Sequence, residues 1–202
     1  MAKLLLATTN RGKIREYQEL LGGLPLELVT PIELGVVLDV EENYPSYEEN
    51  AGIKASTYAK TTGLITLADD SGLEVDILGG EPGIRSARAA GEGATDSDRI
   101  EHLLARLKGI PLENRIARFK CVMAIATPEG RTELCRGECP GLIALESRGE
   151  YGFGYDPVFY LPEFGKTIAE LPLEIKNQVS HRGKAARQAY PILQRLAEKV
   201  KP

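Results

Sequence analysis

The chain has 202 residues, 43% of them hydrophobic and 27% charged, enough to bury the core of one globular domain or of two closely packed lobes. Its formal net charge is -4, from 25 Lys and Arg against 29 Asp and Glu. This balance excludes the general positive field that holds polymeric nucleic acid, so we expect no such partner. A small phosphorylated ligand would need a local basic site instead.

No segment of the sequence is expected to enter a membrane. The amino terminus carries an apolar run too short for a signal-peptide core or a transmembrane helix. We therefore expect a cytoplasmic protein without a membrane partner. We find no internal repeat, low-complexity tract or linker, and we expect residues 1–202 to form a single domain.

The three cysteines are expected to be reduced and buried. Cys135 and Cys139 would lie about 13 Å apart on a straight strand, at about 3.3 Å per residue, which exceeds the reach of a disulfide. With only His102 and His181 as possible nitrogen ligands, the sequence does not favour a zinc cluster.

The first 45 residues predict a strand, a loop, a helix and a second strand. Residues 3–7 form an apolar run typical of a buried strand, and the polar residues 8–12 form a turn. Apolar residues at helical spacing follow over residues 14–21, and residues 26–30 predict the second strand. A polar, acidic connection comes next, around residues 39–43.

Residues 47–63 predict a helix with a stripe of small apolar and tyrosine side chains. Ser46 followed by Glu49 has the spacing of a capping box at its start. Asn50 and Lys54 are one turn apart and therefore share a face of this helix.

The middle of the chain predicts a strand, an irregular stretch and a helix. The strand covers residues 64–68, and its end carries the polar residues 69–72. No regular element is expected in the glycine-rich segment 79–91. A helix is expected over residues 97–108, where apolar residues recur at helical spacing.

The last third predicts a hairpin and a long helix. Residues 116–127 and 132–139 form the hairpin, and the helix opens at residues 180–183 and runs to Lys199. Pro191 is expected to kink or divide this helix. Because strands and helices alternate but the hairpin is antiparallel, the expected fold is α/β, with a mixed central sheet and flanking helices.

The loop at residues 8–13 is a candidate phosphate site. It lies between a strand and the start of a helix, where free backbone N–H groups and the helix dipole favour an anion, and Lys13 adds a positive charge. The loop lacks the G-x-x-x-x-G-K-[ST] pattern, so an ordinary helix cap explains the same residues.

The adjacent carboxylates Asp69 and Asp70 are a candidate metal site. Neighbouring residues of a strand point to opposite faces, so one carboxylate can bind a ligand while the other orients the backbone. Mg²⁺ needs only one or two carboxylates besides water and phosphate, so Asp70 with Glu41 or Glu42 would suffice. Solvated capping groups are the alternative interpretation.

Residues 152–157, with the sequence GFGYDP, combine an aromatic ring, a flexible backbone and a carboxylate. They fit either a stacking platform for a base or a tight aromatic turn packed on the core. Lys176, His181 and Arg182 form a basic cluster before the last helix, for which solvation at the surface is the alternative.

Six ordered segments together resemble the inosine triphosphate pyrophosphatase family, also called the XTP/dITP diphosphatases. They are residues 6–13 (LATTNRGK), 49–55 (ENAGIKA), 68–73 (ADDSGL), 82–88 (PGIRSAR), 152–157 (GFGYDP) and 180–183 (SHRG). The chain departs from many relatives at Thr9, where they have glycine, and at Ser147, where they have proline.

The resemblance implies roles for individual residues. Asp70, Lys13 and Lys54 are implied to be catalytic, with Asp70 as the general base. Mg²⁺ is implied to be bound by Asp70 and Glu41, with Glu42 as the alternative to Glu41. The residues implied to bind the substrate are Thr8, Thr9, Asn10, Arg11, Gly12, Lys13, Ser71, Phe153, Gly154, Tyr155, Asp156, Lys176, His181 and Arg182.

The resemblance also implies a fold and an activity. The expected structure is elongated and two-lobed, with a cleft between the lobes, and the expected assembly is a homodimer. The single domain over residues 1–202 would hydrolyse deaminated purine nucleoside triphosphates (ITP, dITP and XTP) to the monophosphate and pyrophosphate. The alternatives are a pyrophosphatase for another modified nucleotide and a non-catalytic nucleotide sensor, which would not need a general base.

Overall fold

The computed structural model describes residues 2–199, which contain one eight-stranded sheet and five α-helices. The strands are β1 (Ala2–Leu6), β2 (Leu26–Val29), β3 (Ile65–Val75), β4 (Pro82–Gly83), β5 (Ile116–Ala126), β6 (Thr132–Ile143), β7 (Phe159–Leu161) and β8 (Lys166–Thr167). The helices are α1 (Arg11–Leu20), α2 (Tyr47–Thr62), α3 (Asp96–Arg106), α4 (Leu173–Val179) and α5 (His181–Lys199).

The sheet is mixed, which confirms the predicted α/β class. Its strand order is β2-β1-β3-β5-β6-β7-β8, and β4 pairs with β3. β1 runs parallel to both β2 and β3, as expected when helices connect consecutive strands. β4 is antiparallel to β3, and β7 is antiparallel to both β6 and β8.

The chain divides into two compact units, neither of which is continuous in sequence. The first unit comprises Met1–Asp70, Cys121–Gly137 and Arg182–Pro202, and the second comprises Ser71–Lys120 and Glu138–His181. β3, β5 and β6 each contribute residues to both units. The single domain expected from the sequence stays a prediction.

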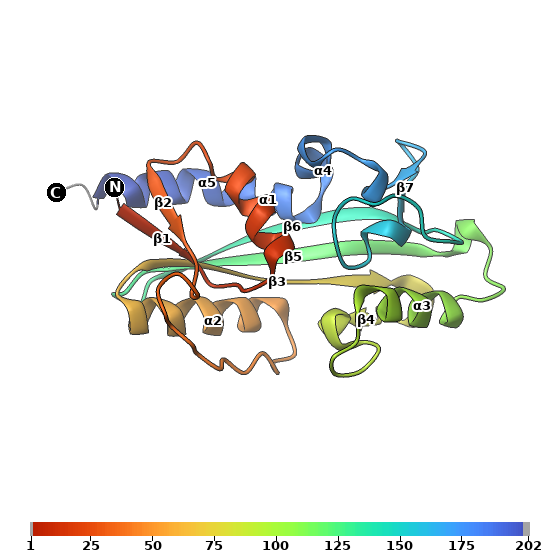
Figure 1. Cartoon of the computed structure of the whole chain (residues 1–202), viewed down its shortest axis with the longest axis horizontal. Helices are drawn as coiled ribbons and strands as arrows, with labels where there is room; N and C mark the ends of the chain where they lie inside the picture. Colours follow the sequence, from red (N-terminus) through yellow and green to blue (C-terminus); the bar gives the residue numbers. More distant parts are fainter. Residues whose placement is uncertain (1, 200–202) are drawn as a thin grey trace. The chain divides into compact units, whose positions relative to one another are not determined.

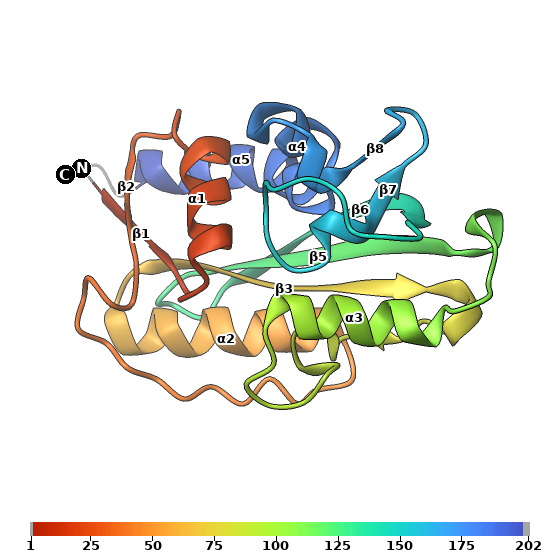
Figure 2. The same cartoon turned by 45° about the vertical axis from the view of Figure 1, so that its right-hand side comes forward.

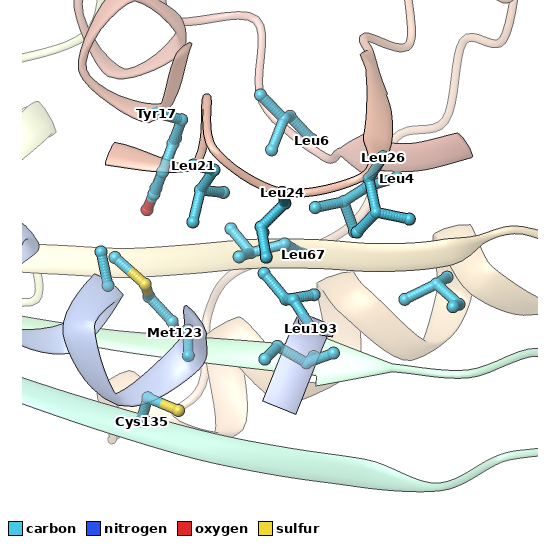
Figure 3. Packing of buried hydrophobic residues seen from close by; sticks show 14 of the residues in the cluster. Leu4, Leu6, Tyr17, Leu21, Leu24, Leu26, Leu67, Met123, Cys135 and Leu193 are labelled. Carbon is cyan, nitrogen blue, oxygen red and sulfur yellow. The ribbon is translucent and has the colours of Figure 1, made fainter. Parts of the chain in front are cut away.

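The core of the first unit is built mainly from leucine and alanine side chains. Leu4 of β1, Leu67 of β3 and Met123 of β5 are completely or almost completely buried in one cluster with Tyr17 and Leu193 (Figure 3). Helices α1 and α5 cover one face of the strands of this unit, and α2 covers the other (Figure 1). This packing fixes the loop between β1 and α1 at the carboxyl end of β1.

The second unit has a separate core of aromatic and branched side chains. Phe119 of β5 and Phe159 of β7 have ring centroids 4.4 Å apart, and Ile100 and Leu103 of α3 belong to the same cluster. In this unit α3 and α4 lie on opposite faces of the strands (Figure 2).

The third strand is longer than the sequence pattern predicts. The apolar run ends at Ala68, but β3 continues to Val75, so Asp69 and Asp70 lie within the strand and not at its end. The cause is pairing that the local sequence does not reveal. The parallel pairing with β1 ends at Leu6–Leu67, and antiparallel pairing with β4 holds the far end of β3 at Leu73–Gly83.

Other differences from the sequence predictions are local. Pro191 does not divide α5, which runs without a break through it, and β6 extends beyond the expected end at residue 139. The short elements β4, β7, β8 and α4 were not expected, because two to seven residues carry too little periodicity to be recognised.

The structure also bears on the cysteines and on membrane-spanning helices. The three cysteines are free and buried, as expected. No helix among residues 2–199 is long and apolar enough to cross a membrane.

Candidate functional site

The loop between β1 and α1 combines a helix cap with a charged side chain. The Asn10 side chain accepts a hydrogen bond from the Lys13 backbone N–H at 3.0 Å, and the Asn10 N–H donates to Thr8 Oγ1 at 3.2 Å. Thr9 and Arg11 are exposed, whereas Thr8 is buried. The cap therefore leaves a short exposed loop at the positive end of α1, beside a lysine.

Lys13 forms an ion pair with the buried carboxylate of Asp69. Its Nζ lies 2.9 Å from Asp69 Oδ2, and Asp69 is 1% exposed. Burial opposes ionisation of Asp69, but Lys13 and Arg182 outweigh it and hold the pKa of this carboxyl well below its ordinary value. Asp69 is therefore a charged anchor, a role that the sequence did not assign to it.

Arg182 belongs to the same buried network. Its Nη1 lies 2.6 Å from Glu16 Oε2 and its Nη2 lies 3.4 Å from Asp69 Oδ2. The guanidinium is 2% exposed, and burial would lower its pKa, but Glu16 and Asp69 raise it well above the ordinary value. With Lys13, the network contains two cations and two carboxylates, so the buried charges balance.

Asp70, the next residue, has a raised pKa, in contrast to Asp69. Burial raises its pKa to about 6, although the hydrogen bond from Asn50 and the charge of Lys13 both lower it. Glu42 and Asp69 add to the increase by repulsion. A carboxylate with a pKa near neutrality can accept a proton, as a general base must.

Asn50 orients Asp70 and was not predicted as a site residue. Its Nδ2 donates to Asp70 Oδ2 at 3.0 Å, while its Oδ1 accepts from the Tyr44 N–H at 3.0 Å. Asn50 is 2% exposed and lies among the alanines of α2. A polar residue on the apolar face of a helix is the signal in the sequence that could have identified this role.

The acidic candidates Glu41 and Glu42 differ in their surroundings. Lys54 Nζ lies 2.8 Å from Glu42 Oε1, and Glu42 is close enough to Asp70 to affect its pKa. Glu41 is exposed. Within residues 2–199, no group of three or more His, Cys, Asp or Glu side chains could hold a metal ion. Two carboxylates that leave most positions to water and phosphate fit Mg²⁺ better than zinc.

In the second unit, Asp156 organises the predicted base platform. Asp156 Oδ2 accepts the Phe153 N–H at 2.9 Å and is also bonded by Lys176 Nζ. The ammonium of Lys176 lies 4.8 Å from the centre of the Phe153 ring. One face of this ring therefore has a cation–π partner, and the ring is held by the loop that carries it.

Tyr155 and Gly154 are anchored to other segments of the second unit. Tyr155 is 5% exposed, and its hydroxyl donates to the Ser86 carbonyl oxygen at 3.1 Å. The Gly154 N–H donates to Asp96 Oδ2 at 2.7 Å. Tyr155 is thus a buried anchor, and Asp96 is a contact of the loop that the sequence analysis missed.

His181 lies at the boundary of the second unit. Its ring is stacked on Phe119, with centroids 4.6 Å apart and an angle of 16° between the planes. His181 is 4% exposed. The next residue, Arg182, belongs to the first unit, so these two neighbours in the predicted basic cluster have different surroundings. Ser71, the first residue of the second unit, is half-buried.

The structure therefore gathers the predicted residues in two groups. Lys13, Lys54 and Asp70 lie in the first unit with Asp69 and Asn50. The second unit contains the remaining candidates for base recognition, which are Phe153, Gly154, Tyr155, Asp156, Lys176 and His181.

Comparisons with known proteins cover nearly the whole chain. The sequence model of the Ham1 family matches residues 4–192. The dITP/XTP pyrophosphatase of Desulforamulus reducens is 50% identical over 194 residues, which are 96% of this chain and 96% of that protein. The dITP/XTP pyrophosphatase of Photorhabdus laumondii is 51% identical, over 96% of this chain and 98% of its own.

Solved structures agree with these sequence relatives. A HAM1 protein from Coxiella burnetii superposes with a TM-score of 0.86 at 43% identity, covering 96% of this chain and all of its own (100%). The Ham1 protein of Staphylococcus aureus gives a TM-score of 0.82 at 41% identity, covering 98% of this chain and 100% of its own.

Proposed function

Because this chain belongs to the Ham1 family, we propose that it hydrolyses deaminated purine nucleoside triphosphates (dITP, ITP and XTP) to the monophosphate and pyrophosphate. The main structural support for this reaction is the environment of Asp70. Burial raises its pKa to about 6, and Asn50 donates a hydrogen bond to its carboxylate. Removal of such nucleotides from the nucleotide pool follows from this reaction.

The first unit supplies the residues for the triphosphate. In the loop of residues 8–13, the backbone N–H groups of Thr8, Asn10 and Lys13 already donate to Leu6, Thr8 and Asn10. Thr9, Arg11 and Gly12, at the start of α1, would therefore supply the backbone N–H groups for the phosphates. Lys13 and Lys54 already have carboxylate partners, so their ammonium groups are held in place before a phosphate arrives. Preorganised cations stabilise charge on phosphate oxygens at little cost in reorganisation.

Asp70 and one of its acidic neighbours are proposed to hold Mg²⁺. Bound Mg²⁺ would neutralise charge on the phosphate oxygens. The ion pair of Glu42 with Lys54 and its effect on the pKa of Asp70 support Glu42, whereas the resemblance favours the exposed Glu41. Glu41→Gln and Glu42→Gln decide between them: the variant of the metal ligand should need the higher Mg²⁺ concentration for half-maximal activity.

Asp70 is proposed to act as the general base. Its carboxylate accepts a proton from water as the water oxygen attacks phosphorus, and the bond to the pyrophosphate leaving group breaks. Asn50 keeps one carboxylate oxygen oriented during this transfer. No covalent intermediate is required, since positioning and electrostatics provide most of the acceleration in phosphoryl chemistry.

The second unit is proposed to recognise the base. Phe153 would stack on the purine, and the donors Lys176 and His181 would face the oxygen at position 6 of hypoxanthine or xanthine. Adenine presents an amino group there, so a buried donor would lose its partner at a cost of about 1 to 3 kcal/mol. Arg182 and Ser71 stay predicted substrate contacts. The buried ion pairs of Arg182 with Glu16 and Asp69 support an additional role in fixing Asp69, the partner of Lys13.

Product analysis with a nucleotide panel tests the proposal. With Mg²⁺, the protein should convert ITP, dITP and XTP to monophosphate and pyrophosphate much faster than ATP. Asp70→Asn should nearly abolish turnover, while the exposed Asp39→Asn should not. Binding without turnover would instead indicate a nucleotide sensor, and a preference for another modified nucleotide would contradict the substrate class.

Two further proposals concern assembly and location. We propose a homodimer, which the resemblance implies, and a location in the cytoplasm, which is the expectation from the sequence. Light scattering at several protein concentrations would test the assembly, and a mass of one 22.0 kDa chain at every concentration would contradict it.

A further inference from the structure

The loop that carries Phe153 has an anchor on α3 that the proposed chemistry does not use. The Gly154 N–H donates to Asp96 Oδ2 at 2.7 Å, across 58 positions of the sequence. Asp96 is the first residue of α3, and both residues belong to the second unit. A hydrogen bond to a charged acceptor is stronger than one between neutral groups, so this contact can hold a loop.

Asp96 is itself fixed from its other side. Arg99 forms an ion pair with Asp96 Oδ1. The same guanidinium donates to the Ala87 carbonyl oxygen at 3.1 Å and to the Ala94 carbonyl oxygen at 2.5 Å. Arg99 therefore ties the segment before α3 to the carboxylate that bonds Gly154.

Gly154 has no side chain to restrain its backbone, because glycine adopts positive and negative φ about equally readily. Its φ is +62°, in the left-handed region, and a Cβ added there would contact nothing within 4 Å. The neighbouring residues are held by other partners: Asp156 accepts the Phe153 N–H, and the Tyr155 hydroxyl bonds Ser86. Asp96 supplies the restraint at the peptide that follows the Phe153 ring.

We propose that Asp96 is a positioning residue for the purine: by holding the Gly154 amide, it fixes the orientation of the Phe153 ring for stacking. The proposal rests on the proposed function, because it takes Phe153 as the platform for the base. Asp96 touches neither the base nor the phosphates in this scheme. Its effect passes through one peptide group.

Amide hydrogen exchange of the nucleotide-free protein tests the hydrogen bond between Gly154 and Asp96. In Asp96→Ala, the amide of Gly154 should exchange faster by about tenfold or more, because a charged acceptor is lost. Asp96→Asn keeps an acceptor oxygen and should stay closer to wild type. The matched control is Asp98→Ala in the same helix turn, which removes one half of the capping box, where Asp98 Oδ2 accepts the Thr95 N–H at 2.7 Å, and leaves the Thr95 N-cap in place.

Kinetics with ITP tests the consequence for the base. Asp96→Ala should raise KM by about tenfold, with a smaller change in kcat, because stacking acts through binding. In a Phe153→Ala background, Asp96→Ala should add little, since the ring that it positions is absent. A merely structural role would give additive effects.

Three results would overturn the proposal. They are unchanged exchange at Gly154 in Asp96→Ala, an equal change in Asp98→Ala, and additive effects in the double variant. If the wild-type protein hydrolysed no deaminated purine nucleotide, the proposed function would fail, and the role toward the base would fail with it. Exchange at Gly154 would still decide whether Asp96 holds the loop.

Discussion

At the scale of single residues, the two adjacent carboxylates of β3 illustrate how neighbours acquire opposite properties. Asp69 is buried between Lys13 and Arg182 and has a lowered pKa, whereas Asp70 has a pKa raised to about 6. Alternation along the strand sends them to different partners, one to two cations and the other to Asn50. Asp69 is suited to anchor a lysine, and Asp70 is suited to accept a proton.

The raised pKa of Asp70 predicts a pH-dependent stability. Its folded value of about 6 lies above the ordinary 3.8, so ionisation costs stability as the pH rises from about 4 through 6. The difference between these two pKa values corresponds to a loss of about 3 kcal/mol in the free energy of unfolding at neutral pH. In metal-free buffer, Asp70→Asn should therefore be more stable than wild type at pH 8, and the difference should shrink near pH 4. Urea unfolding at both pH values measures it.

The exposed Asp39→Asn is the control for that experiment, since its effect on stability should be small at either pH. An Asp70→Asn difference of equal size at pH 4 and pH 8 would contradict the assigned shift.

Glu16 is predicted to be essential for the buried network. Glu16→Gln leaves Arg182 without its closest carboxylate, 2.6 Å away, and should lower the free energy of unfolding by about 3 to 5 kcal/mol. Glu19→Gln, exposed on the same helix, should change it by less than about 0.5 kcal/mol. Equal effects of the two substitutions in thermal or urea unfolding would show that the network contributes no more than a surface charge.

Phe153 is predicted to contribute to nucleotide affinity by stacking. Phe153→Ala should weaken ITP binding by about 1 to 3 kcal/mol and affect ITP and ATP alike, because stacking discriminates little among purines. Lys176 variants should instead narrow the preference for ITP. Phe164, which is 38% exposed in a turn of the same unit, is the control position. Calorimetric titration in an Asp70→Asn background measures binding without turnover. If Phe153→Ala weakened the binding of ITP but not of ATP, the assignment of affinity to Phe153 and of selectivity to Lys176 would be refuted.

At the scale of elements, the loop before Asp156 depends on a glycine. Gly152 has φ +79°, and a Cβ there would lie 2.1 Å from Asp156 Oδ2, the oxygen that bonds Lys176 and the Phe153 N–H. Gly152→Ala should therefore lose ITP affinity as well as stability. Gly165→Ala, at φ +62° with nothing within 4 Å, should show only the backbone cost of about 1 to 2 kcal/mol. Calorimetry and unfolding of both variants separate the two effects.

At the scale of the whole molecule, the chain is acidic overall, and the positive charges of the candidate site are confined to a few side chains. The net charge is -4, yet Lys13, Lys54, Lys176 and Arg182 are all paired with carboxylates. Such a distribution suits a small anion and not a polymer. Fluorescence anisotropy should therefore detect no binding of single-stranded or duplex DNA at physiological salt. Binding that weakens steeply with salt would contradict this expectation.

The sequence by itself determined the local elements and much of the chemistry. The apolar run before the first loop, Asn10 ahead of α1, and the spacing of Asn50 and Lys54 are encoded within a few residues, so the strand, the cap and the helix face were predictable. The mixed sheet also followed, because the alternation of strands and helices and the hairpin are local patterns.

Only the tertiary structure decided which polar groups meet. Asp69 with Arg182, Asn50 with Asp70, and Asp96 with Gly154 are separated by 113, 20 and 58 positions, and no periodicity relates their partners. The continuation of β3 past its apolar run likewise depends on pairing with strands elsewhere in the chain. Local sequence specifies the conformation of each segment, but burial, and with it the pKa of Asp70, is set by what packs around that segment.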